Sequence, residues 1–279
     1  MKKVALIPNT SRDRGLAVSR SVSELLASLG IIVYAEREVC AGIPSAIPVG
    51  RLTELPNDVE LVIVVGGDGS MIDASFVAIS RDIPIIGVNL GKVGYLSEVD
   101  PDNISVLSRL ASGEYTVEEK MLLTVSGSEG RLAVNDIVIS HESYLGIGDF
   151  RVEAVAGDAL HYRADAVVFS TPQGSTAYSL SAGGPIVSHD VDTIVLSPVA
   201  PHSLFNRSVL FGADNKIRVT NLGDEEINVS VDGRFSHKLA GGESCEISRA
   251  EKRIKMLTFT ENSMFSSFFK KMRILEDIR

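Results

Sequence analysis

Residues 61–69 read LVIVVGGDG, and this stretch decides how the first part of the chain should fold. The five apolar residues from Leu61 to Val65 are typical of a strand that is buried on both faces of a parallel sheet. Glycines follow the strand, and a helix is expected from Ser70 to about Ile79. Such a turn suits phosphate binding, because backbone N–H groups and the positive end of the helix dipole face the anion.

The segments around this stretch alternate in the same way between short strands and amphipathic helices. Strands are expected at residues 4–8, 31–34 and 83–88, with helices at 18–29 and 102–111. Glycines and prolines interrupt residues 36–57, which are therefore expected to form a long irregular loop. The pattern predicts an N-terminal Rossmann-like α/β domain with a parallel sheet, a nucleotide-binding domain over residues 1–112.

The alternation of strands and helices ends after Gly113, where the segments become short and β-rich. They are divided by Gly, Asn and Asp, and they include residues 121–125, 133–140, 150–156, 166–169 and 227–231. This pattern predicts an antiparallel, β-sandwich-like domain over residues 113–258, with a short helix within 174–181. Residues 259–279 are amphipathic, and we expect this C-terminal segment to pack back on the first domain rather than on a membrane surface.

Composition narrows the class of protein. The 279 residues include 36 acidic and 27 basic side chains, a net charge of −9, which argues against a nucleic-acid partner. No apolar run approaches the roughly 20 residues of a membrane-spanning helix, and the apolar stretch near the N-terminus is too short for a signal peptide. A cytoplasmic location is expected. Cys40 and Cys245 fit no metal or redox spacing and are expected to be small buried hydrophobic residues.

Asp68 is the unusual member of the glycine loop. Bound phosphates would repel its carboxylate unless it holds a divalent cation or accepts a proton from an attacking hydroxyl. The structural alternative is that Asp68 caps the following helix. The loop is not a GxGxxG fingerprint, because Ile72 stands where the third glycine belongs, and no GxxxxGK[ST] or GxSxG sequence occurs. With these motifs excluded, the remaining interpretation is a nucleotide-binding enzyme of another motif class.

Residues 170–185, STPQGSTAYSLSAGGP, form a second distinctive stretch. Hydroxyl groups, backbone amides and one tyrosine between glycines could bind the sugar and base of a nucleoside. The alternative is that the hydroxyls only cap turns. Asn135-Asp136, between two β segments, is by itself more typical of a plain turn.

Taken in this order, the segments resemble the NAD kinase family. The resemblance is carried by the GGDG loop at 66–69, residues 89–96 (similar to the family's NxGxxGFL segment), Asn135-Asp136, residues 170–185, and SPVAPHSL at 197–204. It covers roughly residues 60–235 and the general layout of both ends. Diacylglycerol-type lipid kinases carry a similar GGDG loop, and the long hydroxyl-rich stretch decides between the two families.

The resemblance implies transfer of a phosphoryl group from ATP or polyphosphate to the 2′-hydroxyl of the adenosine ribose of NAD, giving NADP. Asp68 would accept the hydroxyl proton, Gly67 and Gly69 would seat the phosphates, and a divalent ion, Mg²⁺ by expectation, would lie on the phosphates. Because both substrates are anionic, Lys92 and Arg207 could add positive charge, and each could equally be structural. The implied dinucleotide contacts are Asn135, Asp136, Arg163, Asp165, Thr176, Ala177, Tyr178, Ser179, Leu180, Ser181, His202 and Arg234.

The resemblance also implies a homodimer or homotetramer, because Asp165 and the segment around His202 can contact a ligand bound mainly to a neighbouring subunit in this family. Some residues depart from the family pattern. Gln173 replaces the more usual Thr or Ser, Arg234 stands where Gln is frequent, and residues 163–166 read RADA instead of RGDG.

Two other functions stay open on the sequence alone. A non-catalytic dinucleotide-binding or regulatory protein could keep the pocket without turnover, but it would have little use for the carboxylate of Asp68. A lipid kinase should expose an apolar, membrane-facing surface, and only the C-terminal phenylalanines suggest one.

Overall fold

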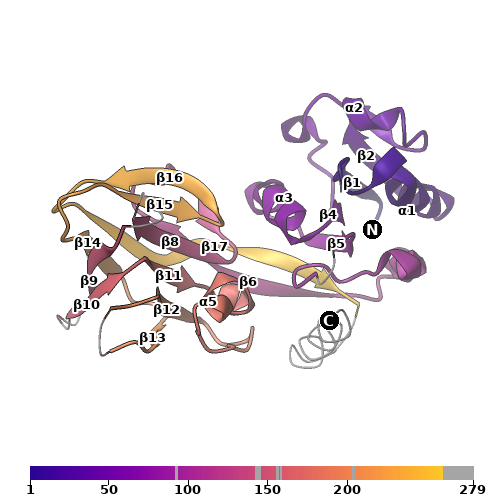
Figure 1. Ribbon diagram of the computed structural model, residues 1–279. Coiled ribbons are helices and arrows are strands. Elements are labelled where there is room, and N and C mark those ends of the chain that lie inside the picture. Colours follow the sequence, from indigo (N-terminus) through magenta and orange to yellow (C-terminus); the bar gives the residue numbers. More distant parts are fainter. Residues whose placement is uncertain (92–93, 142–145, 155–156, 158, 203–204, 260–279) are drawn as a thin grey trace, which may run out of the picture. The chain divides into compact units, whose positions relative to one another are not determined.

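The computed structural model describes residues 1–91, 94–141, 146–154, 157, 159–202 and 205–259 (Figure 1). The described residues form two compact units, residues 1–119 with 254–259 and residues 120–253. The boundary between the units falls inside two strands, β6 (Thr116–Val125) and β17 (Ser244–Thr258). Apart from Phe259, which is buried in the core of the first unit, the predicted C-terminal segment lies outside the described residues.

The first unit contains the predicted parallel sheet. Its strands run in the order β5-β4-β1-β2-β3, and the end of β17 pairs in parallel with β5 through Met256 and Ile85. The bounds are β1 (Lys3–Pro8), β2 (Ile32–Glu36), β3 (Ile47–Val49), β4 (Leu61–Gly66) and β5 (Ile85–Asn89). All neighbouring pairs in this series are parallel, which confirms the predicted α/β class.

Every residue of β4 is buried because helices cover the sheet from both sides. Leu61, Ile63 and Val65 share a core with Val22 and Leu26 of α1 (Ala17–Ser28). The alternate residues of β4 face the other way, toward α3 (Asp68–Arg81), and Figure 1 shows α1 and α3 on opposite sides of the sheet. Burial on both faces explains why the strand reads as a continuous apolar run.

The irregular loop predicted at residues 36–57 is wrong in part. The segment contains α2 (Arg37–Cys40), the edge strand β3 and the 3-10 turn η2 (Leu52–Glu54). Pro48 is tolerated in β3 because an edge strand has only one neighbour, so a missing N–H need not break the sheet. The remaining helical segments of the first unit are η1 (Arg14–Leu16), η3 (Pro101–Ser108) and α4 (Arg109–Ser112).

The second unit is built from antiparallel strands, as predicted. Six of them form one sheet in the order β13 (Val209–Gly212), β12 (Thr193–Val199), β11 (Ala166–Ser170), β8 (Asp136–His141), β15 (Ile227–Val231) and β16 (Arg234–Leu239). The other strands of this unit are β7 (Leu132–Ala133), β9 (Gly148–Ala154), β10 (Ala159–Ala164) and β14 (Ile217–Asn221), together with its parts of β6 and β17.

Side chains from both groups of strands fill one core in this unit. Phe150 and Tyr162 enter it from β9 and β10, and Phe169 enters it from β11. The predicted short helix within 174–181 is present as a 3-10 turn, η4 (Gln173–Thr176), followed by α5 (Tyr178–Ser181). The core shared by the two groups of strands confirms the predicted sandwich-like packing.

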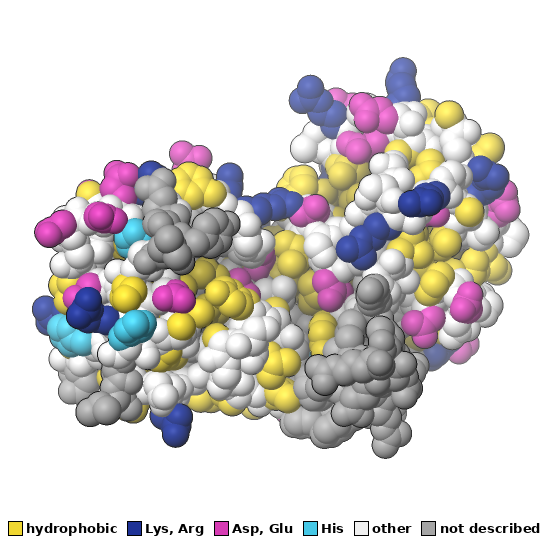
Figure 2. Space-filling view, in the orientation of Figure 1, with side chains coloured by type: hydrophobic (Ala, Val, Ile, Leu, Met, Phe, Trp, Pro, Cys, Tyr) yellow, Lys and Arg dark blue, Asp and Glu magenta, His cyan; other side chains and the backbone are white. Residues whose placement is uncertain are grey.

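The surface charges are mixed, and of the two cysteines only Cys245 is buried as predicted. Acidic and basic side chains are interspersed on the face seen in Figure 2, so the net charge of −9 is not gathered in one patch there. Within the described ranges, no helix is long and apolar enough to cross a bilayer. Cys245 is buried, and burial raises the pKa of its thiol to about 12, whereas Cys40 is only partly buried.

Candidate functional site

Asp68 follows the carboxyl end of β4 and is the first residue of α3. Gly67 occupies the N-cap position, so the alternative that Asp68 caps the helix is wrong. The carboxylate turns instead to the segment after β5, where Oδ2 accepts the N–H of Tyr95 at 2.8 Å and Oδ1 accepts the N–H of Leu96 at 3.0 Å. A carboxylate has about four acceptor positions. Asp68 is thus held in a fixed orientation with acceptor capacity left for a ligand.

Asn89, Gly91 and Gly94 provide the local geometry that this contact needs. Asn89 Oδ1 accepts the N–H of Gly91 at 2.8 Å. Gly94 has a φ of +62°, and a β-carbon there would lie 2.5 Å from the side-chain amide of Asn89. Glycine at 94 therefore lets the chain turn back over Asn89 and present two N–H groups to Asp68.

Arg12 is a candidate site residue that the sequence reading missed. A β-carbon on Gly67 would lie 2.7 Å from its Nη1 atom, and one on Gly91 would lie 3.1 Å from the same atom. The loop that carries Arg12 is fixed by Asn9, whose Oδ1 accepts the N–H of Arg12 at 3.1 Å. Across the described part of the chain, Arg12 forms no ion pair, and its side chain is exposed. The guanidinium thus lies over the glycine loop with its charge available.

The signal that could have found Arg12 is its place after β1. Strands β1, β4 and β5 are parallel neighbours, so the loops at their carboxyl ends share one edge of the sheet. Of the two basic residues that could supply positive charge, Lys92 lies outside the described residues. Arg207 lies in the second unit and donates to Asn206 Oδ1 at 2.8 Å.

Asn135 and Asp136 lie where β7 leads into β8. The Thr171 hydroxyl donates to the carbonyl of Val134 at 2.7 Å, and its N–H donates to the carbonyl of Asn135 at 2.9 Å. The N–H of Gly174 in turn donates to Thr171 Oγ1 at 2.9 Å. A β-carbon on Gly174 would lie 2.0 Å from the Asn135 carbonyl oxygen. The hydroxyl-rich stretch therefore packs directly on the Asn135–Asp136 backbone, which only glycine at 174 permits.

The carboxyl group of Asp136 is strongly perturbed. Its residue is 6% exposed, and burial, followed by the charge of Asp232, raises its pKa from 3.8 to about 7, against the opposing hydrogen bond from the N–H of Tyr178. Because the pKa is raised in the fold, the protonated group favours the folded state, and this contribution is lost as pH rises toward and through about 7. Ligand hydroxyls that donate to Asp136 would favour its ionised form.

The stretch from Thr176 to Ser181 is divided between the interior and the surface. Thr176 and Ser179 are buried, and their hydroxyls bond within the chain, to the carbonyl of Gln173 at 3.3 Å and to Ser197 Oγ at 3.1 Å. Tyr178 and Ser181 are exposed, and Ala177 and Leu180 are partly exposed. In this structure a ligand could reach the second group directly.

The other candidate contacts lie in the same unit. The N–H of His202 donates to the carbonyl of Arg163 at 2.7 Å, and both residues are exposed. The pKa of Tyr178 is raised by burial first, and then by the charges of Asp136 and Asp165, which places these three side chains in one electrostatic neighbourhood. Arg234, at the start of β16, is exposed and pairs with Val231 across a tight turn.

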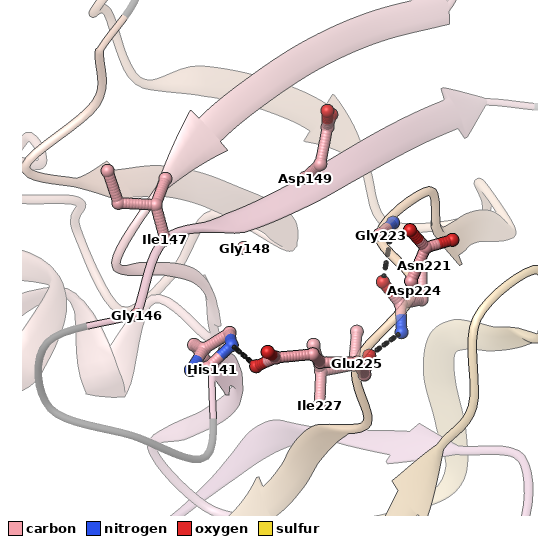
Figure 3. Close-up of a pocket in the computed structure, with 10 residues that line it drawn as sticks. All are labelled: His141, Gly146, Ile147, Gly148, Asp149, Asn221, Gly223, Asp224, Glu225 and Ile227. Carbon is pink, nitrogen blue, oxygen red and sulfur yellow. Dashed lines mark hydrogen bonds and ion pairs between the residues drawn. The ribbon is translucent and has the colours of Figure 1, made fainter.

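A separate pocket of about 490 Å³ lies in the second unit (Figure 3). His141 and Glu225 pair across it, with 2.8 Å between His141 Nε2 and Glu225 Oε2, and Asp149 and Asp224 also line it. The described residues that line it include no Lys or Arg. Because phosphates would be repelled by these carboxylates, this pocket does not suit a dinucleotide.

Family profiles match both parts of the chain. The profile described as the ATP-NAD kinase N-terminal domain matches residues 4–115, and the ATP-NAD kinase C-terminal domain matches residues 134–259.

Curated relatives match over nearly the whole length. A protein named NAD kinase from Lachnoclostridium phytofermentans is 34% identical over 95% of this chain and 96% of its own length. NAD kinases from Geotalea daltonii and Geobacter sp. strain M21 are 31% and 32% identical, each over 98% of this chain and 99% of the relative.

Solved structures share the fold. An NAD kinase from Archaeoglobus fulgidus in complex with ATP superposes with a TM-score of 0.78 at 23% identity, covering 98% of this chain and 99% of that one. Yeast NADH kinase complexed with NADH gives a TM-score of 0.83 at 21% identity, covering 98% of this chain and 86% of that one.

Proposed function

This chain belongs to the NAD kinase family, and we propose that it phosphorylates the 2′-hydroxyl of the adenosine ribose of NAD with ATP, giving NADP, and that Asp68 accepts the hydroxyl proton. The observation that carries the role of Asp68 is its fixed carboxylate beside a glycine loop at the carboxyl edge of a parallel sheet. Phosphoryl transfer depends mainly on alignment and charge stabilisation, so one oriented acceptor and a set of amides can suffice. Gly67 and Gly69 would seat the donor phosphates.

A β-carbon on Gly69 would meet no atom within 4 Å, so the space above this residue is open to a ligand. Gly67 differs, because Arg12 lies against it. The loop therefore combines open backbone with a cation, which is the arrangement that a polyphosphate needs.

The residues present suit a metal that arrives with the phosphates. Among the residues that the structure describes, no group of three His, Cys, Asp or Glu side chains is placed to hold a metal ion. Mg²⁺ usually keeps several waters and binds substrate phosphates, so we expect the ion on the phosphates and assign it no protein ligand. A bound Mg²⁺ would neutralise charge on the donor phosphates.

Arg12→Ala should lower kcat/KM for ATP by about 30-fold, because a charge-assisted contact to phosphate is lost. Arg12→Lys should recover part of the loss, since a lysine supplies the charge without the planar fork. Steady-state kinetics at saturating NAD measure the effect. Arg14→Ala is the matched control, because Arg14 is an exposed arginine of the same loop region and should leave the kinetics unchanged. Equal kinetics for Arg12→Ala and the wild type would exclude Arg12 from the donor site.

We assign the dinucleotide to residues of the second unit. Asn135 and Asp136 would bind ribose hydroxyls, and the exposed ring of Tyr178 would cover a base. The partly or fully exposed Ala177, Leu180 and Ser181 would extend this surface, with Thr176 and Ser179 supporting it from inside. Arg163, Asp165, His202 and Arg234 would add polar contacts. These roles rest on the family resemblance together with the exposure of the side chains.

We also propose a homodimer or homotetramer and a cytoplasmic location. Arg163, Asp165 and His202 are exposed, as residues that reach a neighbouring subunit's ligand should be. Sedimentation velocity with and without NAD would measure the assembly state.

Purified protein with Mg²⁺, ATP and NAD is expected to produce NADP, which a coupled NADP-specific dehydrogenase detects. Reactions without donor, and with polyphosphate instead of ATP, show whether ATP is required. Measurable NAD binding without NADP from either donor would favour the non-catalytic dinucleotide-binding protein.

A further inference from the structure

Asp232 lies in the tight turn that joins β15 to β16. Asp232 and Gly233 have φ values of +48° and +73°, the conformation of a two-residue hairpin turn in which Asp-Gly is favoured. The backbone conformation of this turn does not depend on the Asp232 carboxylate. That carboxylate nevertheless has three partners elsewhere in the chain.

The partners are three consecutive backbone N–H groups. Oδ2 accepts the N–H of Val134 at 2.8 Å, and Oδ1 accepts those of Asn135 at 2.8 Å and Asp136 at 3.0 Å. In addition, the N–H of Asp232 donates to the carbonyl of Asp136 at 2.9 Å. Successive amides that converge on one carboxylate form a strong, geometrically defined anion contact.

Asp232 and Thr171 together form hydrogen bonds with all six backbone N–H and carbonyl groups of residues 134–136. Asp232 takes the three N–H groups and donates to the last carbonyl, while Thr171 donates to the other two carbonyls. A turn whose six polar backbone groups are all bonded has one defined conformation, and this sets where the side chains of residues 135 and 136 point.

The electrostatics of the two aspartates fit the same arrangement. Burial raises the pKa of Asp232 above its usual value, and the hydrogen bonds from the N–H groups of Val134, Asp136 and Asn135 oppose this rise. Its charge in turn disfavours ionisation of Asp136. Three backbone N–H groups donate to the Asp232 carboxylate, and one, from Tyr178, donates to that of Asp136, so Asp232 is the better placed of the two to hold a negative charge.

We infer that Asp232 is a positioning residue of the dinucleotide site, whose carboxylate holds the 134–136 turn so that Asn135 and Asp136 can bind the ribose hydroxyls. This inference rests on the proposed function in assigning those two side chains to the dinucleotide. The role assigned to Asp232 is indirect, since its carboxylate bonds the backbone of the turn.

Asp232→Asn and Asp232→Gly test the inference, since both replacements tolerate the positive φ of the turn. Each should raise KM for NAD by about tenfold or more, because charge-assisted bonds to the turn are lost, while KM for ATP stays unchanged. A merely structural role would reduce the active fraction and hence Vmax, leaving KM for NAD as in the wild type. The matched control is Asp82→Asn, since Asp82 also has a positive φ, of 55°, but pairs with Lys255 in the first unit.

Hydrogen–deuterium exchange of the peptide that contains residues 134–136 gives a readout that does not need turnover. Protection should fall in Asp232→Gly and not in Asp82→Asn. Lost protection with an unchanged KM for NAD, or a lower Vmax alone, would overturn the positioning role while the proposed function stands. If the wild type makes no NADP, the proposed function fails, and NAD titration of the two Asp232 variants then decides the inference: unchanged affinity overturns it, and weakened affinity supports it.

Discussion

Asp68→Asn is expected to lower kcat by about 10³-fold, the usual range for removing a general base, while NAD still binds. The substitution keeps the size of the side chain but removes its capacity to take a proton. NADP formation at saturating ATP and NAD measures the loss directly.

The contacts of Asp68 set the expected structural cost of this variant. Both carboxylate oxygens accept a backbone N–H, from Tyr95 and Leu96. An asparagine has one acceptor oxygen, so its NH₂ group must face one of these donors, at a cost of about 1–3 kcal/mol. Thermal unfolding should therefore show a modest decrease in Tm for Asp68→Asn.

The control for this prediction is Asp73→Asn, an exposed aspartate on the same helix, which should keep the wild-type kcat. A folded, NAD-binding Asp68→Asn protein with wild-type kcat would refute the role of Asp68 as proton acceptor. Loss of NAD binding together with turnover would instead point to damage of the site.

Among substitutions that add one methyl group in the second unit, Gly174→Ala should lower stability and weaken NAD binding the most. The added β-carbon would lie 2.0 Å from the Asn135 carbonyl oxygen and 2.7 Å from the Asn135 Cα atom. These are backbone atoms, so no side-chain rotation can relieve the clash. The loop at 173–176 and the 134–136 turn must separate, which breaks the contacts made by Thr171.

Overpacking of this kind costs about 3 kcal/mol, which corresponds to a Tm lower by roughly 5 °C in a chain of this size. KM for NAD should rise as well, because the turn that carries Asn135 and Asp136 is displaced. Differential scanning calorimetry and steady-state kinetics measure the two effects.

Gly212→Ala is the matched control for Gly174→Ala. It lies in the same unit, has no positive φ, and a β-carbon there would meet only Asn215 Nδ2, at 3.4 Å. Its Tm and KM for NAD should equal those of the wild type. If Gly174→Ala behaves like this control, the close contact between residues 174 and 135 does not determine the site.

Part of the fold could be predicted because its cause is local. The apolar run at 61–65 predicts a strand covered on both faces, and the helix after Gly69 follows from the change of pattern. Strand β3 was missed because Ile47–Val49 is only three residues long and contains Pro48. It is a strand only because β2 lies beside it, through pairs such as Tyr34 with Ile47.

The candidate site divides in the same way. Asp68, Asn135 and Asp136 could be singled out by residue type and by resemblance. Asp232 could not, because it bonds residues that are 96 to 98 positions away along the chain. Arg12 has only the indirect signal of its place after β1, and its contact with Gly67 and Gly91 needs the folded sheet.

The sequence by itself determined the alternation of strands and helices on either side of the glycine loop, the position of that loop, and the residues Asp68, Asn135 and Asp136 as groups that could do chemistry, since these follow from periodicity, residue type and resemblance. Only the tertiary structure decided the hydrogen-bond partners, the burial and the pKa of each group. It placed two N–H donors on Asp68 and buried Asp136 near Asp232, which raises the pKa of Asp136 to about 7. Hydrogen bonds and desolvation act over a few ångströms, between segments that only folding brings together.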